Sequence, residues 1–221
     1  MRPVLVDLSV GPRKQAFAFY RSAVQPRWGL TTRVDVAPLL AALPAWREAQ
    51  PGLSAFVAYH HALLRAADAV PELRQRLTQQ GDVVQWAQLD ASPTVLRADD
   101  SFAFARLRHA RHLRDFAPAA LAAIERSLAV GTDWGLDDEH QPAALHTTVL
   151  PLVHFSGFQH ARVSASDDGT PAIAMGRFER EGGRCWMPLN VVVHHALVDG
   201  VHVGRFVQAL QEGLDQPLAQ W

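Results

Sequence analysis

Hydrophobic residues recur at helical spacing in several stretches of the chain. Ser54 is a suitable N-cap for the apolar run Ala55–Ala69, and the Ala- and Leu-rich run His112–Val130 stops at Gly131. We therefore expect a long helix over each run. Two further helices are expected: a short one at Pro71–Arg74, and a last one that Gly200 opens and that continues from His202 to about Gly213.

Shorter apolar runs bounded by Gly, Pro and Asp predict strands. Turn signals lie at Gln80–Asp82, Ser166–Gly169 and Glu181–Gly183, and the last two are typical of hairpins. Helices interspersed with strands, with antiparallel-looking strands late in the chain, predict a mixed α/β fold. No break in composition divides the chain, so residues 1–221 are expected to form one domain. The expected strands are Thr31–Val36, Val83–Leu89, Thr94–Leu96, Thr147–Phe155, Gln159–Ser164, Ala172–Arg180 and Cys185–His195.

Composition excludes several classes of protein. Of the 221 residues, 48% are hydrophobic and 19% are charged, so the chain can bury a sizeable core and is not disordered as a whole. A net charge of −1 creates no field that favours nucleic acid or an anionic membrane. The N-terminus reaches Asp7 too early for the apolar region of a signal peptide, and no run approaches a membrane span. We expect a soluble cytoplasmic protein.

Metal binding has little support in the sequence. The single cysteine, Cys185, excludes an internal disulfide and a multi-cysteine metal site. Among the 11 histidines, His109 and His112 stand three residues apart and could chelate an ion from one helix. Their segment is rich in Arg and offers few carboxylates, which favours a solvated basic face. We expect no metal.

The segment from Val191 to Gly200 carries the candidate chemistry. A hydrophobic strand runs into His194 and His195 and stops, and Asp199 follows four residues after the second histidine. A neutral imidazole at the end of a strand is suited to act as a general base near pH 7. The alternative is that both histidines belong to the core and that Asp199 only caps the last helix. The pattern alone favours neither interpretation.

The motif His194-His195-Ala196-Leu197-Val198-Asp199-Gly200 resembles the signature of the trimeric chloramphenicol acetyltransferases, within the CoA-dependent acyltransferase superfamily. Two relatives share its core. The acyltransferase cores of 2-oxo acid dehydrogenase complexes usually read Asp-His-Arg there and carry further segments, and peptide-synthetase condensation domains are about twice as long as this chain. Matching stretches run in order along the chain at Phe17–Arg21, Pro71–Arg74, Gly81–Trp86, Thr94–Val95, Met175–Phe178, Met187–Leu189 and Val201–Arg205.

This resemblance implies a two-layer sandwich, in which helices cover a mixed sheet, and a homotrimer with active sites between subunits. It implies that His195 removes the proton from a hydroxyl of chloramphenicol, which attacks the thioester of acetyl-CoA directly, without an acyl-enzyme. Acetyl-CoA would be a co-substrate, with no permanently bound cofactor. The resemblance also implies that the backbone of His195 fixes the tautomer of its own ring. Asp199 would be structural and would pair with a base near the N-terminus.

The resemblance assigns further residues to binding. Tyr20, Thr94, Phe102 and Phe155 match positions that line an apolar acceptor pocket, and Arg177 and Phe178 match the region that touches CoA. Without the resemblance, the two Phe residues of that pocket would be read as core residues, and Arg177 as an ordinary surface residue.

Some positions depart from the family pattern. A serine that stabilises the oxyanion is expected between two aromatic residues, but Gly157 stands there and Ser156 is displaced by one residue. On a strand, this displacement would point Ser156 to the other face. Ala174 replaces a second polar residue, a threonine. The position expected for the partner of Asp199 holds Lys14, with Arg13 adjacent.

Three functions therefore compete. The first is a chloramphenicol O-acetyltransferase that inactivates the antibiotic. The second is an acyltransferase of the same fold that acts on a different hydroxyl acceptor. The third is a weakly active or non-catalytic protein that binds a small molecule.

Overall fold

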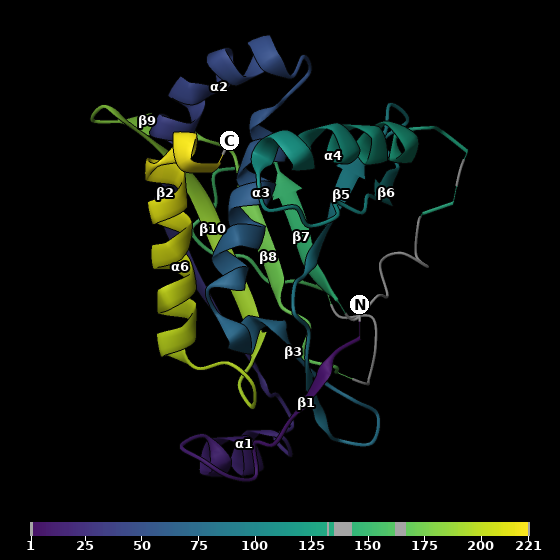
Figure 1. The fold of residues 1–221 in the computed structure, drawn as a ribbon, viewed down its shortest axis with the longest axis vertical. Helices are drawn as coiled ribbons and strands as arrows, with labels where there is room; N and C mark the ends of the chain where they lie inside the picture. Colours follow the sequence, from purple (N-terminus) through teal and green to yellow (C-terminus); the bar gives the residue numbers. More distant parts are fainter. Residues whose placement is uncertain (1, 132, 135–142, 162–166, 221) are drawn as a thin grey trace.

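A computed structural model describes residues 2–131, 133–134, 143–161 and 167–220 of the chain. Its centre is a seven-stranded mixed sheet in the order β2-β10-β8-β7-β5-β6, with β9 paired to β10 (Figure 1). The parallel pairs are β5 with β7 and β7 with β8, and the other pairs of this sheet are antiparallel. Its strands are β2 (Arg27–Asp35), β5 (Asp90–Leu96), β6 (Phe102–Phe104), β7 (Ala144–Leu150), β8 (Ala172–Gly176), β9 (Glu179–Glu181) and β10 (Arg184–His194).

Strand register defines two ends of this sheet. Because β10 runs against β8, its last residue His194 lies at the end where β8, β7 and β5 begin, and it pairs with Arg27 of β2. We call this the His194 end. The opposite end holds the last residues of β5, β7 and β8, such as Leu96 and Gly176.

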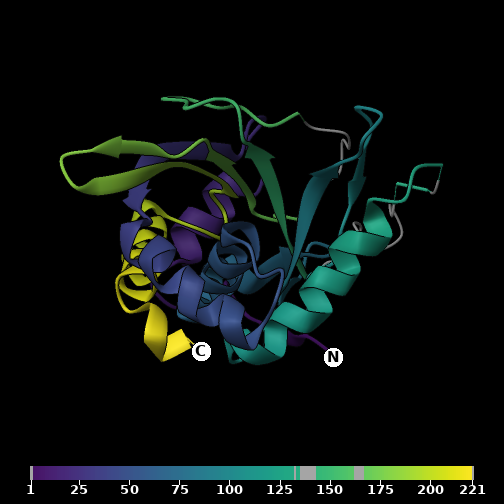
Figure 2. The same ribbon diagram turned by 90° about the horizontal axis from the view of Figure 1, so that it is seen from above.

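Helices cover one face of the sheet, and Figure 2 shows them gathered on one side of the strands. The central helix, α3 (Ala55–Asp68), packs against α4 (Leu113–Ser127) and α6 (Gly200–Asp215), and most of its residues are buried. Every second residue of β10, including Leu189, Val191 and Val193, is buried in the core cluster shared with the helices. This confirms the expected fold of a mixed sheet covered by helices. The covering helices are α2 (Ala37–Ala49), α3 (Ala55–Asp68), α4 (Leu113–Ser127) and α6 (Gly200–Asp215).

Smaller elements complete the fold beyond the His194 end. A three-stranded sheet has the order β1-β4-β3, and α1 lies beside it at the foot of the molecule (Figure 1). Among the described residues, no helix is long and apolar enough to cross a membrane. The elements beyond the His194 end are β1 (Val4–Val6), α1 (Lys14–Tyr20), β3 (Gln75–Leu77) and β4 (Val83–Gln85). The chain also has two 3-10 turns, η1 (Pro71–Arg74) and η2 (Pro217–Gln220).

Local signals explain several of the correct predictions. Ser54 caps α3, where its hydroxyl accepts a hydrogen bond from the amide of Val57 at 3.3 Å. The hairpin between β9 and β10 turns on Gly182 and Gly183, whose φ angles of 57° and 82° suit glycine. The expected helix over His112–Val130 is present in shortened form as α4.

Other expectations were wrong. The strand predicted over Thr147–Phe155 ends at Leu150, and Phe155 to Phe158 lie outside any strand. Residues 159–161, the first part of the predicted strand Gln159–Ser164, are not a strand either. Residues 162–166, which include the rest of that predicted strand and Ser166 of the expected hairpin turn, lie outside the described residues. The run Ala172–Arg180 breaks after Gly176 into β8 and β9. The pattern also missed α1, β1, β3, β6 and the proline-containing α2.

Candidate active site

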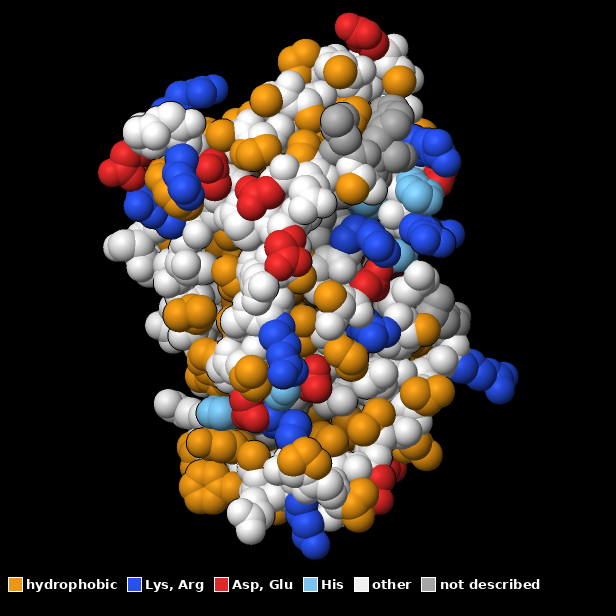
Figure 3. Space-filling model, turned by 60° about the vertical axis from the view of Figure 1, so that its left-hand side comes forward, with side chains coloured by type: hydrophobic (Ala, Val, Ile, Leu, Met, Phe, Trp, Pro, Cys, Tyr) orange, Lys and Arg blue, Asp and Glu red, His pale blue; other side chains and the backbone are white. Residues whose placement is uncertain are grey.

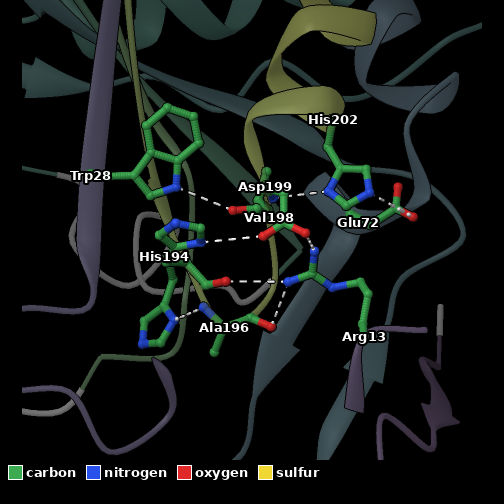
Figure 4. Close-up of polar contacts among 9 residues, drawn as sticks. Arg13, Trp28, Glu72, His194, Ala196, Val198, Asp199 and His202 are labelled. Atoms are coloured by element: carbon green, nitrogen blue, oxygen red, sulfur yellow. Dashed lines mark hydrogen bonds and ion pairs between the residues drawn. The ribbon is translucent and has the colours of Figure 1, made fainter. Parts of the chain in front are cut away.

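A tight turn follows the last residue of β10. The carbonyl oxygen of His194 accepts hydrogen bonds from the amides of Leu197 (3.0 Å) and Val198 (2.9 Å). The ring of His194 is buried, and its Nδ1 accepts a hydrogen bond from the amide of Ala196 at 3.2 Å (Figure 4). His194 therefore holds the turn together and keeps its neighbour His195 in place.

The side chain of His195 stands between aromatic residues. Its backbone amide donates to the carbonyl oxygen of Pro26 at 2.8 Å. Its ring stacks on that of Tyr20, with centroids 3.8 Å apart and planes at 6°, and the ring of Trp28 is centred 5.6 Å away. The side chain keeps 30% of its surface exposed, so a substrate can reach it.

Arg13, at the N-cap of α1, ties this turn to the start of the chain. Its guanidinium forms an ion pair with Asp199 Oδ2 and donates to the carbonyl oxygens of His195 (3.2 Å) and Ala196 (3.0 Å) (Figure 4). The fork of the guanidinium makes these simultaneous contacts possible. Lys14, placed by sequence at the position of the partner, is exposed. The partner of Asp199 is the adjacent Arg13.

Asp199 also faces the imidazole. Its Oδ1 lies 3.2 Å from Nδ1 of His195, so the carboxylate spans the space between Arg13 and the ring. The resemblance implied that the backbone of His195 would fix the tautomer. In the structure Nδ1 makes no hydrogen bond, either to that backbone or to the carboxylate, so the tautomer of His195 stays a prediction.

His202 binds the backbone of Asp199 and lies next to Glu72. The amide of Asp199 donates to Nδ1 of His202 at 2.9 Å, and Nε2 of that ring lies 3.6 Å from Glu72 Oε1 (Figure 4). Burial lowers the pKa of His202, although the nearby Glu72 opposes this shift. Because Nδ1 accepts a hydrogen bond, the neutral ring carries its proton on Nε2, toward Glu72.

The other candidate binding residues lie far from His195 within the chain. Thr94, near the end of β5, and Phe102 of β6 belong to the opposite end of the sheet. Phe155 packs against Phe158 and against Gly176, the last residue of β8. Arg177 and Phe178 follow that residue; Arg177 is exposed, and the ring of Phe178 packs against the core. Of the predicted acceptor residues, only Tyr20 touches His195.

The positions that depart from the family pattern differ in environment. Gly157 is exposed, and a Cβ added to it would meet no atom within 4 Å. Ser156 is also exposed and lies outside any strand, so strand alternation does not set the direction of its side chain. Ala174 is fully buried in the centre of β8, where it pairs with Asn190.

One histidine of the candidate metal-binding pair, His109, contacts a carboxylate. His109 Nε2 lies 2.7 Å from Asp68 Oδ2, and His112 is the N-cap residue of α4. Within the ranges that the structure describes, no group of three or more His, Cys, Asp or Glu side chains is arranged to hold a metal ion.

Comparison with known proteins identifies the family to which the chain belongs. A sequence profile of the family described as chloramphenicol acetyltransferase matches residues 1–211. The chain belongs to the chloramphenicol acetyltransferase family. It is therefore an acyltransferase.

Relatives of this acetyltransferase family match nearly the whole chain. Chloramphenicol acetyltransferase 2 of Escherichia coli is 30% identical over 211 residues, which cover 93% of this chain and 94% of that protein. The enzyme of Streptomyces acrimycini is 30% identical over 217 residues, with 97% and 96% covered. A solved chloramphenicol acetyltransferase structure superposes with a TM-score of 0.84 at 23% identity and covers 96% of this chain and 100% of its own; this likeness shows the fold.

In this member of the chloramphenicol acetyltransferase family, the sequence did not predict that His202 would hold the backbone of Asp199. Its position three residues after Asp199 was the available signal, since residues at this spacing meet across the first turn of a helix. Nothing in the sequence placed Glu72 beside it, because η1 is distant in the chain and meets α6 only in the folded protein.

Proposed function

We propose that this protein transfers an acetyl group from acetyl-CoA to a hydroxyl of chloramphenicol, with His195 as the general base. The supporting observation is the setting of the imidazole, whose Nδ1 faces Asp199 and whose side chain stays partly exposed. Nε2 is then available to accept a proton from a bound hydroxyl. The acyl-transfer chemistry of the family is consistent with this role.

The reaction proceeds in two steps. Nε2 of His195 takes the proton of the acceptor hydroxyl as its oxygen bonds to the thioester carbonyl carbon, which forms a tetrahedral oxyanion. The oxyanion then collapses, the carbon–sulfur bond breaks, and the imidazolium returns its proton to the leaving thiolate of CoA. No side chain forms a covalent intermediate. Asp199 faces the imidazolium while it is charged, and a base in this position contributes about 10²–10⁴-fold to the rate.

The alternative function is an acyltransferase of the same fold that acts on a hydroxyl acceptor other than chloramphenicol. The family pattern expects a hydroxyl at Gly157, and this glycine leaves open space. An acceptor bulkier than chloramphenicol could occupy that space, and oxyanion stabilisation would then come from elsewhere. The loss of one oxyanion donor costs about 10²–10³-fold in rate, so the wild-type enzyme is expected to acetylate chloramphenicol slowly.

We further propose that the protein acts as a homotrimer whose sites are completed between subunits. Tyr20 and His195 lie at the His194 end, whereas Thr94, Phe102 and Phe155 lie toward the opposite end. Adjacent chains in a closed ring could bring the two groups together. CoA would then reach His195 past Arg177, whose exposed guanidinium suits a phosphate.

Exposed apolar side chains support such an assembly. Phe19 is 71% exposed and Val24 is 99% exposed, and with neighbours on α1 they line an open hollow of about 710 Å³. In Figure 3, hydrophobic side chains gather at the lower end of the molecule, where α1 lies in Figure 1. Apolar surface of this kind marks interaction sites in soluble proteins.

Mixed oligomers test the shared site. His195→Ala removes the base, and Gly157→Arg fills the open space with a bulky cation. Each variant alone is expected to be inactive. When equal amounts are unfolded together and refolded, about a quarter of the sites combine an intact base with an intact pocket, and a corresponding share of activity should return. No recovery in mixtures of correctly folded chains would contradict the shared site.

Release of free CoA thiol from acetyl-CoA tests the activity itself. Thiol release that depends on chloramphenicol supports the proposal, and release that depends only on other hydroxyl compounds supports the second acceptor. Binding of chloramphenicol without thiol release would identify the third function, a non-catalytic binder.

A further inference from the structure

A second arginine, Arg27, lies beside the turn of His195 and binds a neighbouring segment of the chain. Arg27 is the first residue of β2 and pairs in register with His194. Its Nε and Nη2 donate to the two carboxylate oxygens of Asp167 at 2.8 and 2.6 Å, and Nη1 donates to the carbonyl oxygen of Thr170 at 2.7 Å. One guanidinium therefore fixes both ends of the segment 167–170.

This ion pair is well shielded. The side chains of Arg27 and Asp167 keep only 15% and 13% of their surfaces exposed. A paired, forked contact in this setting is stronger and more directional than an exposed one. The segment has its own internal bonds as well, since Thr170 donates through its amide and its hydroxyl to Asp168 at 2.9 and 2.8 Å.

The clamped segment lies directly against the turn of His195. Gly169 has φ of 81°, and a Cβ there would lie 2.5 Å from Leu197 Cδ1 and 3.6 Å from Cβ of His194. Only a glycine backbone can approach so closely. Gly169 thus contacts His194 and Leu197, the two residues that flank His195 and Ala196 in the turn.

We propose that Arg27 and Asp167 are a positioning pair for the reaction, which press Gly169 onto the turn and so fix the ring of His195. This inference rests on the proposed role of His195 as the base. Arg13 holds the same turn through its carbonyl groups. The turn is thereby held through two arginines, Arg13 at the N-cap of α1 and Arg27 at the start of β2.

Kinetics of single and double variants test the pair. Arg27→Gln and Asp167→Asn each remove the ion pair while keeping the size of the side chain. Each is expected to lower kcat by about 10- to 100-fold through misplacement of the base, with KM for acetyl-CoA unchanged. Because both act through one contact, the double variant should lose no more than either single variant.

Arg106→Gln is the matched control. Arg106 pairs with Asp90 at 2.8 Å, with side chains 23% and 19% exposed, at the same end of the sheet but separated from β10 by β7 and β8. It should leave kcat unchanged. A pair that only stabilises the fold would lower the melting temperature of the Arg27 variant without lowering kcat, and that result would overturn the proposal, as would additive losses in the double variant.

A second measurement separates this proposal from the proposed function. The Cε1–H signal of His195, observed in the full protein with ¹³C-labelled histidine, should move in both single variants and stay in place in Arg106→Gln. If wild-type protein releases no thiol, the proposed function fails, and this signal alone decides the clamp. An unmoved signal would overturn the positioning role.

Discussion

The imidazole of His195 and the phenol ring of Tyr20 lie face to face, with centroids 3.8 Å apart and planes within 6° of parallel. Tyr20 is the last residue of α1, whose N-cap is Arg13. This short helix therefore contacts the proposed base at both ends, through a ring at one end and a guanidinium at the other.

Removing the stack should slow the reaction without stopping it. An aromatic pair contributes about 0.5–1.5 kcal/mol beyond its buried area, so Tyr20→Leu should lower kcat by about 2- to 10-fold. Tyr20→Phe keeps the stacked face and serves as the control, with kcat close to wild type. Equal losses in both variants would show that the hydroxyl, and not the stack, matters.

The ion pair between Arg13 and Asp199 should contribute to both stability and activity. Their side chains are 14% and 32% exposed, so the ion pair is partly buried. Asp199→Asn should lower the free energy of unfolding by about 1–3 kcal/mol and should lower kcat. Urea unfolding and thiol release measure the two effects.

Lys14→Ala provides the matched control for this pair, because Lys14 is the exposed neighbour of Arg13. Arg13→Ala should reproduce the losses of Asp199→Asn, and Lys14→Ala should cause neither. Losses of similar size in the Lys14 variant would contradict the assignment of Arg13 as the partner.

A serine at Gly157 should restore an oxyanion donor. The added side chain meets no neighbour within 4 Å in the chain, and the backbone there is not in the left-handed region. If the site is otherwise intact for chloramphenicol, Gly157→Ser should raise kcat, with a ceiling of about 10²–10³-fold, and leave KM unchanged. Gly157→Ala, which fills the same space without a hydroxyl, should give no rise. A folded serine variant with unchanged kcat would favour a site built for another acceptor.

Stability should fall as the pH drops below 6.5. Burial lowers the pKa of His60 from its ordinary value of 6.5 to about 4, although its contact with the Phe56 carbonyl opposes this shift. Between these two values the unfolded chain binds a proton that the folded one does not, so acid favours unfolding by up to about 3 kcal/mol. Burial also lowers the pKa of His160 to about 4, so this residue acts in the same direction.

Urea unfolding between pH 7.5 and pH 4.5 measures this dependence. His60→Gln should reduce the slope of unfolding free energy against pH without removing it, because His160 remains. A slope identical to that of wild type would contradict the assignment to His60.

Sequence patterns predicted the parts of the fold that local chemistry decides. The cap at Ser54, the hairpin at Gly182 and the strand that ends at His194 each follow from residues close together in the chain. The two-layer sandwich came from family resemblance, and the order of the strands was not predicted, since no local pattern encodes which strands pair. The helix α2 was missed because Pro38 and Pro44 weaken its pattern, yet the structure accommodates both.

The site divided in the same way. The motif located His195 and Asp199, but only the folded chain shows that Arg13 and not Lys14 reaches the carboxylate. The family pattern pointed to Lys14, one residue away from the true partner, and one residue on a short helix moves a side chain by a large angle. Glu72 and Arg27 act through long-range contacts that have no sequence signature.

Acetyl transfer by His195→Ala, measured as chloramphenicol-dependent release of CoA thiol, tests the role of His195 most directly. The control is His112→Ala, which changes the histidine at the N-cap of α4, away from the turn. Both variants should remain folded by circular dichroism. We expect the His195 variant to lose at least about 10²-fold in kcat and the His112 variant to keep wild-type turnover. Retention of more than about a tenth of wild-type kcat by folded His195→Ala would contradict general-base catalysis by this residue.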